Sequence, residues 1–234
     1  MSSSLVHFIP ILTTLLAVPF SLEIFRRYLA HPERLHLLWW AIGVATYGVG
    51  TFTEAATTLV GWQEPVFRAW YVSGALLGGA PLAQGTVYLL LSRRVAHALT
   101  ALLILYVVVA SVAVYSSPID YTLVETHRLS GRVFAWQWVR MFSPFVNLYA
   151  VVFLIGGAIL SALRYSADPS TRHRMWANVF IAVGAILPGI GGTATRMGHV
   201  EVLYVTELAG MLLTWLGYRM SIAPLKVTSD LAIS

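Results

Sequence analysis

The chain contains no cysteine among its 234 residues. That absence excludes disulfides, zinc thiolate sites, iron–sulfur clusters and thiol catalysis. Charge is also scarce, since Lys and Arg together number 15 and Asp and Glu together number 10. Hydrophobic residues make up 58% of the sequence, more than the polar surface of a soluble domain of this size could cover. The composition therefore indicates a membrane protein.

Motifs that would identify an enzyme or a cofactor protein are missing as well. The sequence has neither an HExxH motif nor a Ser/His/Asp nucleophile arrangement, and its 7 histidines fall at the ends of apolar blocks or in loops. The stretch Gly189–Ala194 fits the dinucleotide pattern GxGxxG/A, but no strand precedes it. We expect no metal and no cofactor, and an intramembrane enzyme acting on a lipid or quinone is the third interpretation.

The apolar residues fall in seven blocks of about 20 residues, the length that a helix needs to cross the hydrocarbon core of a bilayer. The blocks are Leu5–Phe25, Leu37–Val60, Val66–Leu91, Ala96–Ser116, Met141–Leu163, Trp176–Thr195 and Val200–Met220. The first block follows an uncharged N-terminus, unlike a signal peptide, so we expect it to stay as a helix. This pattern predicts an all-α, polytopic integral membrane protein with a single seven-helix domain at residues 1–221 and a short tail at 222–234.

The positive charges are distributed unevenly between the two sides of these blocks. Ten fall on one side: Arg26, Arg27, Arg34, Arg93, Arg94, Arg164, Arg172, Arg174, Arg219 and Lys226. Five fall on the other: Arg68, Arg128, Arg132, Arg140 and Arg196. Because positive residues are enriched in cytoplasmic loops, the first side is predicted to be cytoplasmic and the N-terminus to be outside. This explains the basic net charge without a nucleic-acid partner and predicts a multi-pass protein of a prokaryotic plasma membrane, in contact with the lipid bilayer.

Two basic turns in the sequence repeat the same skeleton without a gap. Arg27–Trp39 reads RYLAHPERLHLLW, and Arg164–Trp176 reads RYSADPSTRHRMW. The matching pairs are Arg27/Arg164, Tyr28/Tyr165, Ala30/Ala167, Pro32/Pro169, His36/His173 and Trp39/Trp176. This repetition predicts two parallel three-helix repeats, residues 5–91 and 141–220, joined by a linker helix at 96–116.

The plan of three helices, a linking helix and three further helices resembles the SWEET and PQ-loop carriers, whose fold places a substrate site between the two triplets. Pro19, Pro144 and Pro188 are similar to the kinked-helix prolines of that family, although the Pro-Gln dipeptide is absent. The helix number and orientation also resemble microbial opsins, but the only lysine is Lys226, in the tail, so conventional retinal binding is excluded. The chain further resembles the seven-helix sensor regions of bacterial histidine kinases, although too few residues follow the last block for an effector domain.

Ionisable residues inside apolar blocks are the candidate functional residues, because such groups usually face a bundle interior or a water-filled cavity. Glu54 and Glu207 fall at a similar depth near the outer side. The candidate ligand or proton site consists of Glu54, Glu207, Arg68, Arg196, Gln84, Tyr71, Tyr204 and Asn147. Two interpretations are open: these residues bind a ligand or a proton, or the charges form an ion-pair network that holds the helices together.

Proline and glycine predict irregular helices at two places. In the third block, Pro81 follows a GxxxG face and precedes Gln84, which falls at mid-membrane depth. In the sixth block, Pro188 and Gly189 predict a kinked or unwound helix. Broken helices line the binding sites of carriers, but tight packing around one buried amide explains the third block equally well.

These features predict a protein that handles a small ligand within a seven-helix bundle, as a transporter rather than a sensor. The alternative is a membrane sensor or an accessory subunit of a larger complex, in which the glycine faces contact a partner. The residues do not distinguish such a partner from a homo-oligomer. In a transporter, Glu54 or Glu207 would carry a proton with an arginine balancing its charge, and Gln84 would contact the substrate.

Overall fold

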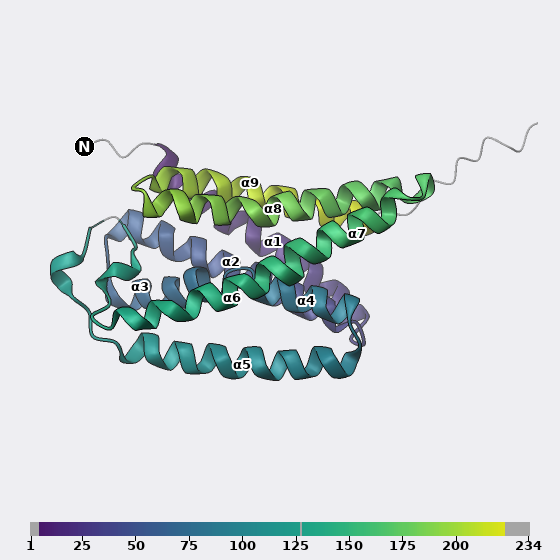
Figure 1. The fold of residues 1–234 in the computed structure, drawn as a ribbon. Helices are drawn as coiled ribbons and strands as arrows, with labels where there is room; N and C mark the ends of the chain where they lie inside the picture. The colour runs from purple at the N-terminus through teal and green to yellow at the C-terminus, as the bar shows by residue number, and fades with distance from the viewer. Residues whose placement is uncertain (1–4, 127, 223–234) are drawn as a thin grey trace, which may run out of the picture.

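The computed structural model describes residues 5–126 and 128–222, which form a bundle of helices (Figure 1). Six helical segments are long and apolar enough to cross a membrane. They are Leu5–Ala30, Leu35–Val60, Arg93–Ser116, Gln137–Ser166, Pro169–Arg196 and Val200–Ile222. The prediction of an all-α, multi-pass membrane protein is therefore confirmed. Lys226 and the predicted tail from residue 223 onward lie outside the described residues.

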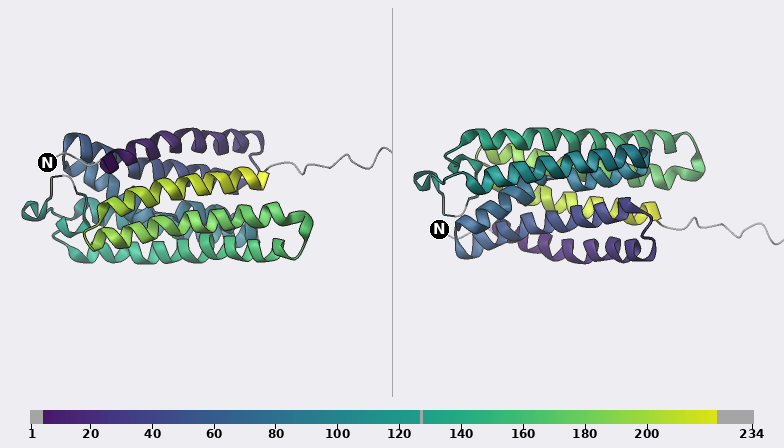
Figure 2. Two further views of the ribbon diagram at one scale, coloured as in Figure 1. Left: turned by 90° about the horizontal axis from the view of Figure 1, so that it is seen from above. Right: turned by 90° about the horizontal axis from the view of Figure 1, so that it is seen from below.

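Helical hairpins make up both ends of the described chain. The 3₁₀ turn η1 (Leu5–Phe8) leads into α1 (Ile9–Ala30), and α2 (Leu35–Val60) returns alongside it. The last two helices, α8 (Arg172–Arg196) and α9 (Val200–Ile222), pair in the same way, and α9 also packs against α1. We call the end of the bundle that carries the turns at residues 31–34, 91–92 and 167–171 the hairpin end. The opposite end, with connections at 61–63, 117–136 and 197–199, is the loop end (Figure 2).

The third apolar block is interrupted instead of forming one helix. It begins as α3 (Glu64–Trp70), widens into the π-helix η2 (Tyr71–Leu77) and resumes as α4 (Ala80–Leu90). Gly78 turns the chain between them with a φ of 45°, which glycine adopts at little cost. Pro81 lies in the first turn of α4, where its missing N–H removes no helical hydrogen bond. The structure therefore places the interruption at Gly78, just before the proline that was expected to cause it.

A second π-helix lies opposite this interruption. The segment after the long connection consists of α6 (Phe142–Ala150), the π-helix η6 (Val151–Ile155) and α7 (Gly156–Ser166). A Cβ atom added to Gly79 would lie 3.3 Å from the Cβ of Ala150 and 3.5 Å from Cδ2 of Leu154, so the two irregular segments pack closely. π-helical turns occur often at functional sites, so the middle of the bundle, where these two segments meet, is a candidate location for one.

The chain is not unwound at Pro188 and Gly189, because α8 remains helical from Arg172 to Arg196. A proline ring displaces the carbonyl four residues earlier, which here belongs to Gly184. That carbonyl lies against α9, where a Cβ atom added to Gly210 would come within 2.6 Å of it. The close packing of α8 on α9 therefore keeps the helix continuous where the local sequence favours a break.

Packed aromatic side chains close the loop end. The chain leaves α5 (Arg93–Ser116) and makes three short 3₁₀ turns, η3 (Tyr121–Leu123), η4 (Gly131–Val133) and η5 (Gln137–Met141). Phe134 of this connection is fully buried, with its ring centre 5.0 Å from that of Phe67 and 4.8 Å from that of Tyr71. The connection thus folds onto α3 and η2 and belongs to the hydrophobic core.

Candidate functional site

A cavity of about 340 Å³ lies within the hairpin end of the bundle. We call it the hairpin-end cavity. Residues of α1, α2, α4, η6, α7, α8 and α9 line it. Leu82, just after the interruption of the third segment, and Leu154, in the opposite π-helix, form part of its wall. The cavity therefore reaches from the basic turns toward the irregular middle of the bundle.

Apolar side chains at helical spacing make most of the cavity wall. They are Phe20, Ile24, Leu37, Trp40, Val44, Leu82, Leu89, Leu154 and Ile181. Spacings of three or four residues place the members of each helix on one face. α7 contributes small side chains at Gly157, Ala158 and Ser161, with the larger Tyr165 one turn further on. The three small residues leave the space between the helices unfilled.

Two arginines are held at the cavity by tyrosine rings. The guanidinium carbon of Arg27 lies 5.9 Å from the ring centre of Tyr218, and its Nη1 donates to the Tyr218 hydroxyl at 3.5 Å. The guanidinium carbon of Arg174 lies 5.8 Å from the ring centre of Tyr165. All four residues line the cavity, and contacts between a cation and an aromatic face are attractive. The tyrosines therefore position the two positive charges at the cavity wall.

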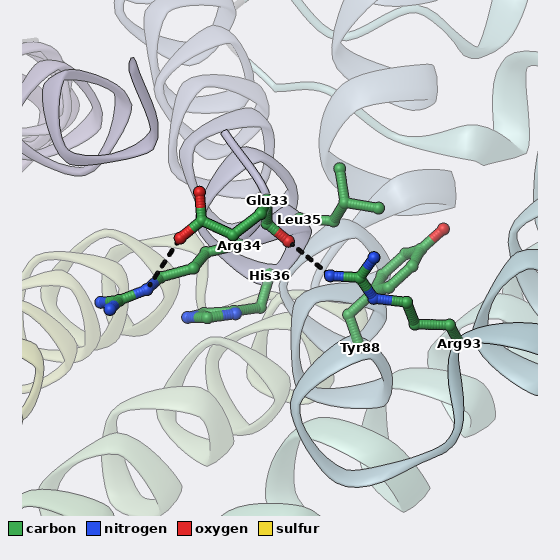
Figure 3. Close-up of a pocket in the computed structure, with 6 residues that line it drawn as sticks. All are labelled: Glu33, Arg34, Leu35, His36, Tyr88 and Arg93. Carbon is green, nitrogen blue, oxygen red and sulfur yellow. Dashed lines mark hydrogen bonds and ion pairs between the residues drawn. The ribbon is translucent and has the colours of Figure 1, made fainter. Parts of the chain in front are cut away.

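A shallow pocket of about 230 Å³ adjoins the cavity at the α1–α2 turn (Figure 3). Arg34 and His36 line both the pocket and the cavity. Glu33 lies between two arginines: its carboxylate is 3.5 Å from Nε of Arg34, and its backbone carbonyl accepts a hydrogen bond from Arg93 at 3.2 Å. The side chains of Arg34 and Glu33 are 49% and 58% exposed, so this ion pair is weak. Arg93 thereby fastens the turn that carries Arg34.

Glu54 of α2 and Glu207 of α9 meet toward the loop end, within hydrogen-bonding reach of each other. Nε1 of Trp70 donates to Glu54 Oε1 at 3.0 Å, and the Tyr47 hydroxyl donates to the backbone carbonyl of Glu207 at 3.0 Å. The Oε2 atom of each carboxyl group is buried without a partner among the described residues. Neither group forms an ion pair within that part of the chain. Because two contacting carboxylates repel unless they share a proton, this pair can hold one.

Arg68 does not balance the carboxyl pair, contrary to expectation. Its Nε donates to Glu64 at 2.8 Å, its Nη2 donates to the carbonyl of Ser117 at 2.8 Å, and its Nη1 donates to the carbonyl of Val114. These carbonyls end α5, where the helix dipole favours a positive charge. Arg68, only 7% exposed, therefore joins α3 to α5 as a structural residue.

The other predicted site residues are divided between several places. Tyr204 lies beside the carboxyl pair, bonds to the side chain of Thr58 and is buried. Tyr71 accepts a hydrogen bond from Ser143 at 3.3 Å within the aromatic core. Asn147 is an exposed residue of α6, and Arg196 is exposed at the end of α8. The structure thus joins Glu54, Glu207 and Tyr204 and separates the rest of the predicted cluster from them.

Gln84 is turned away from the cavity and bonds to neighbouring helices. Its Nε2 donates to the carbonyl of Ala96 at 3.1 Å and to Oγ1 of Thr100 at 2.8 Å, and its Oε1 accepts a hydrogen bond from Tyr149. The side chain is fully buried. The expected substrate contact of Gln84 is therefore replaced by a packing role, because a residue two positions from Leu82 points to the other side of α4.

The cavity brings together residues that the sequence pattern assigns only to turns. Arg27, Arg34 and His36 come from the first repeated turn, and Tyr165 and Arg174 come from the second. The repeated turns were the sequence feature that could have predicted this grouping, because two basic turns on the same side of a membrane lie at the same end of a bundle. The matched positions are not used alike, however, because Arg27 lines the cavity whereas its counterpart is exposed.

The chemistry that the described side chains offer is binding of an anion in the cavity and binding of a proton by the carboxyl pair. Within residues 5–126 and 128–222, no group of three His, Cys, Asp or Glu is arranged to hold a metal ion. No protein-family model, curated protein or solved structure matches the chain, so these assignments depend on the geometry of its own residues.

Proposed function

We propose that this protein is a carrier that moves a small ligand across a prokaryotic plasma membrane. The observation that carries the proposal is a cavity in the hairpin end of the bundle that lies beside the interrupted third segment. The hairpin-end cavity reaches the interrupted third segment, whereas packed aromatics fill the loop end. A site beside a broken helix, accessible from one side at a time, is the arrangement that alternating access requires.

In this proposal the interrupted segment at 64–90 crosses the membrane as a seventh span. Its three pieces α3, η2 and α4 all pack along α2, which supports a path through the full thickness of the bundle. The N-terminus is outside and the hairpin end is cytoplasmic, because nine of the 14 positive residues in the described part of the chain fall at the hairpin end. The cavity is then the cytoplasmic half of the route.

The carboxyl pair supplies a coupling site for protons. Glu54 and Glu207 connect α2 to α9, and a shared proton lets the two helices stay in contact. Loss of that proton would leave two negative charges in contact and would favour separation of α2 from α9. Opening of the loop end would therefore follow from a change in the charge of this pair.

Alternating access can be tested with single cysteines, because the chain has none of its own. Ser161→Cys places a thiol in the cavity, and Thr57→Cys places one at a buried position of α2 near the loop end. We expect a membrane-impermeant maleimide to label Ser161→Cys only from the hairpin side and Thr57→Cys only from the loop side. In the double variant, a bulky adduct at Ser161→Cys should stop labelling of Thr57→Cys, because a filled cavity cannot close. Thr122→Cys, on the exposed connection, is the control that should react throughout.

A Thr57→Cys thiol that never reacts from the loop side would contradict the carrier. Native mass spectrometry of the gently purified protein then distinguishes the remaining functions. A stable complex with a second kind of chain would favour the accessory subunit or sensor, whereas a single chain or homo-oligomer with a retained small molecule agrees with ligand handling.

A further inference from the structure

Among the described residues, the arginines that line the hairpin-end cavity have one ion-pair partner, the exposed Glu33 beside Arg34. None of the described residues that line it is acidic. Nearby carboxylates are hydrogen-bonded to other groups. Glu23 attracts Arg27 electrostatically, but its hydrogen bonds come from Trp215 at 2.9 Å and Arg219 at 2.9 Å. Asp168 accepts hydrogen bonds from the backbone and hydroxyl of Ser170 at 2.9 and 2.7 Å. The Ser170 hydroxyl also lowers the pKa of Asp168, which keeps that carboxylate charged in its own turn.

The weak pair between Glu33 and Arg34 is the only ion pair that a cavity-lining arginine makes among the described residues. Arg27 and Arg174 contact tyrosine rings instead. A cation–π contact leaves the edges of a guanidinium group free to donate hydrogen bonds, and guanidinium groups match carboxylate and phosphate oxygens well. The cavity therefore presents positioned donors for an anion.

The rest of the wall excludes a simple inorganic anion as the best occupant. Below the arginines the wall is mostly apolar, with the side chains of Leu37, Trp40, Val44, Leu82 and Ile181, interspersed with the hydroxyl groups of Thr86 and Thr214. Its volume of about 340 Å³ falls in the range of about 300–1,000 Å³ that is usual for small-molecule sites. A phosphate ion would leave the apolar part empty, and a neutral hydrocarbon would leave the arginines without a partner.

We propose that the hairpin-end cavity binds an amphiphilic anion, with a phosphate or carboxylate head at Arg27, Arg34 and Arg174 and an apolar body against the deeper wall. This assignment names the ligand class of the proposed carrier and rests on that function for its physiological role. The same head chemistry occurs in soluble amphiphiles and in anionic lipids, and the two sources are separated by the probes below.

Binding is measured by native mass spectrometry from a non-ionic detergent, with octyl phosphate as the soluble probe and phosphatidic acid as the lipid probe. Octanol and inorganic phosphate test the two halves of the ligand separately. The triple variant Arg27→Gln, Arg34→Gln, Arg174→Gln should weaken binding by about 100-fold, because charge-assisted hydrogen bonds are lost. The control triple variant Arg26→Gln, Arg94→Gln, Arg172→Gln removes the same charge from exposed positions of the same end and should change binding less than about threefold.

A second pair of variants tests the apolar part without changing charge. Ser161→Phe fills the cavity and should abolish binding of octyl phosphate, whereas Leu160→Phe, on the exposed side of α7, should leave it unchanged. An unchanged melting temperature establishes that a variant is folded. If Ser161→Phe does not fold, the charge variants alone test the binding of octyl phosphate.

Each outcome decides the proposal. Arginine-dependent binding of octyl phosphate supports it with a soluble ligand, and such binding of phosphatidic acid alone supports it with a lipid. Octanol or inorganic phosphate binding as tightly as octyl phosphate would overturn it, as would equal losses in the two triple variants. Arginine-dependent binding without any alternation of the cysteine reporters would refute the carrier and leave the ligand class intact. Alternating labelling of the cysteine reporters without arginine-dependent binding would refute the ligand class and leave the carrier intact.

Discussion

The packing of α8 on α9 gives the sharpest quantitative prediction. Gly210 of α9 faces Gly184 of α8, and a Cβ atom at Gly210 would lie 2.6 Å from the Gly184 carbonyl oxygen and 3.1 Å from Cδ of Pro188. The obstacle is backbone, so Gly210→Ala must push the two helices apart. Overpacking of this kind costs about 3 kcal/mol at the upper end of its usual range, and replacing glycine by alanine in a helix returns about 1 kcal/mol. We expect Gly210→Ala to reduce the free energy of unfolding by about 2 kcal/mol.

The matched control is Gly189→Ala on α8, where an added Cβ atom would meet nothing within 4 Å. There the gain in helix propensity of up to about 1 kcal/mol is not opposed. Both variants are compared by titrating detergent-solubilised protein with sodium dodecyl sulfate and following helix content by circular dichroism. If Gly210→Ala proves as stable as Gly189→Ala, the close approach of α8 and α9 is not as described, and the explanation for the continuous helix at Pro188 fails with it.

Three further changes test other parts of the structure. Glu207→Gln keeps a hydrogen-bonding group beside Glu54 but removes a titratable carboxyl group. We therefore expect proton-driven uptake to be lost while the melting temperature changes little. A large fall in melting temperature together with the loss of uptake would show that the pair is structural. Arg68→Lys removes hydrogen bonds from buried carbonyls at the end of α5 and should cost about 1–3 kcal/mol in the same titration, unlike Arg132→Lys on the exposed connection. Gly78→Ala forces a side chain into a left-handed conformation and should cost about 1–3 kcal/mol, and an unaltered midpoint would argue against the interruption at this residue.

The sequence determined the properties that depend on depth in the membrane. The length of the apolar blocks predicts that the protein spans a membrane. The positions of Glu54 and Glu207 within their blocks predict a similar depth for both residues. The structure brings these two residues together. Depth is a one-dimensional property, so it can be read from residue order with no knowledge of which helices are neighbours.

The tertiary structure alone decided which way each side chain faces. Gln84 bonds to α5 instead of lining the cavity, Arg68 bonds to the end of α5 instead of balancing a glutamate, and α9 holds α8 continuous across Pro188. Each outcome depends on the rotation and distance between two helices. Those quantities are set by contacts of the whole bundle, and the spacing of residues along a single helix does not contain them. For the same reason, the arginines of two distant turns reach the same cavity wall only when α1, α2, α7 and α8 have packed around a common cavity.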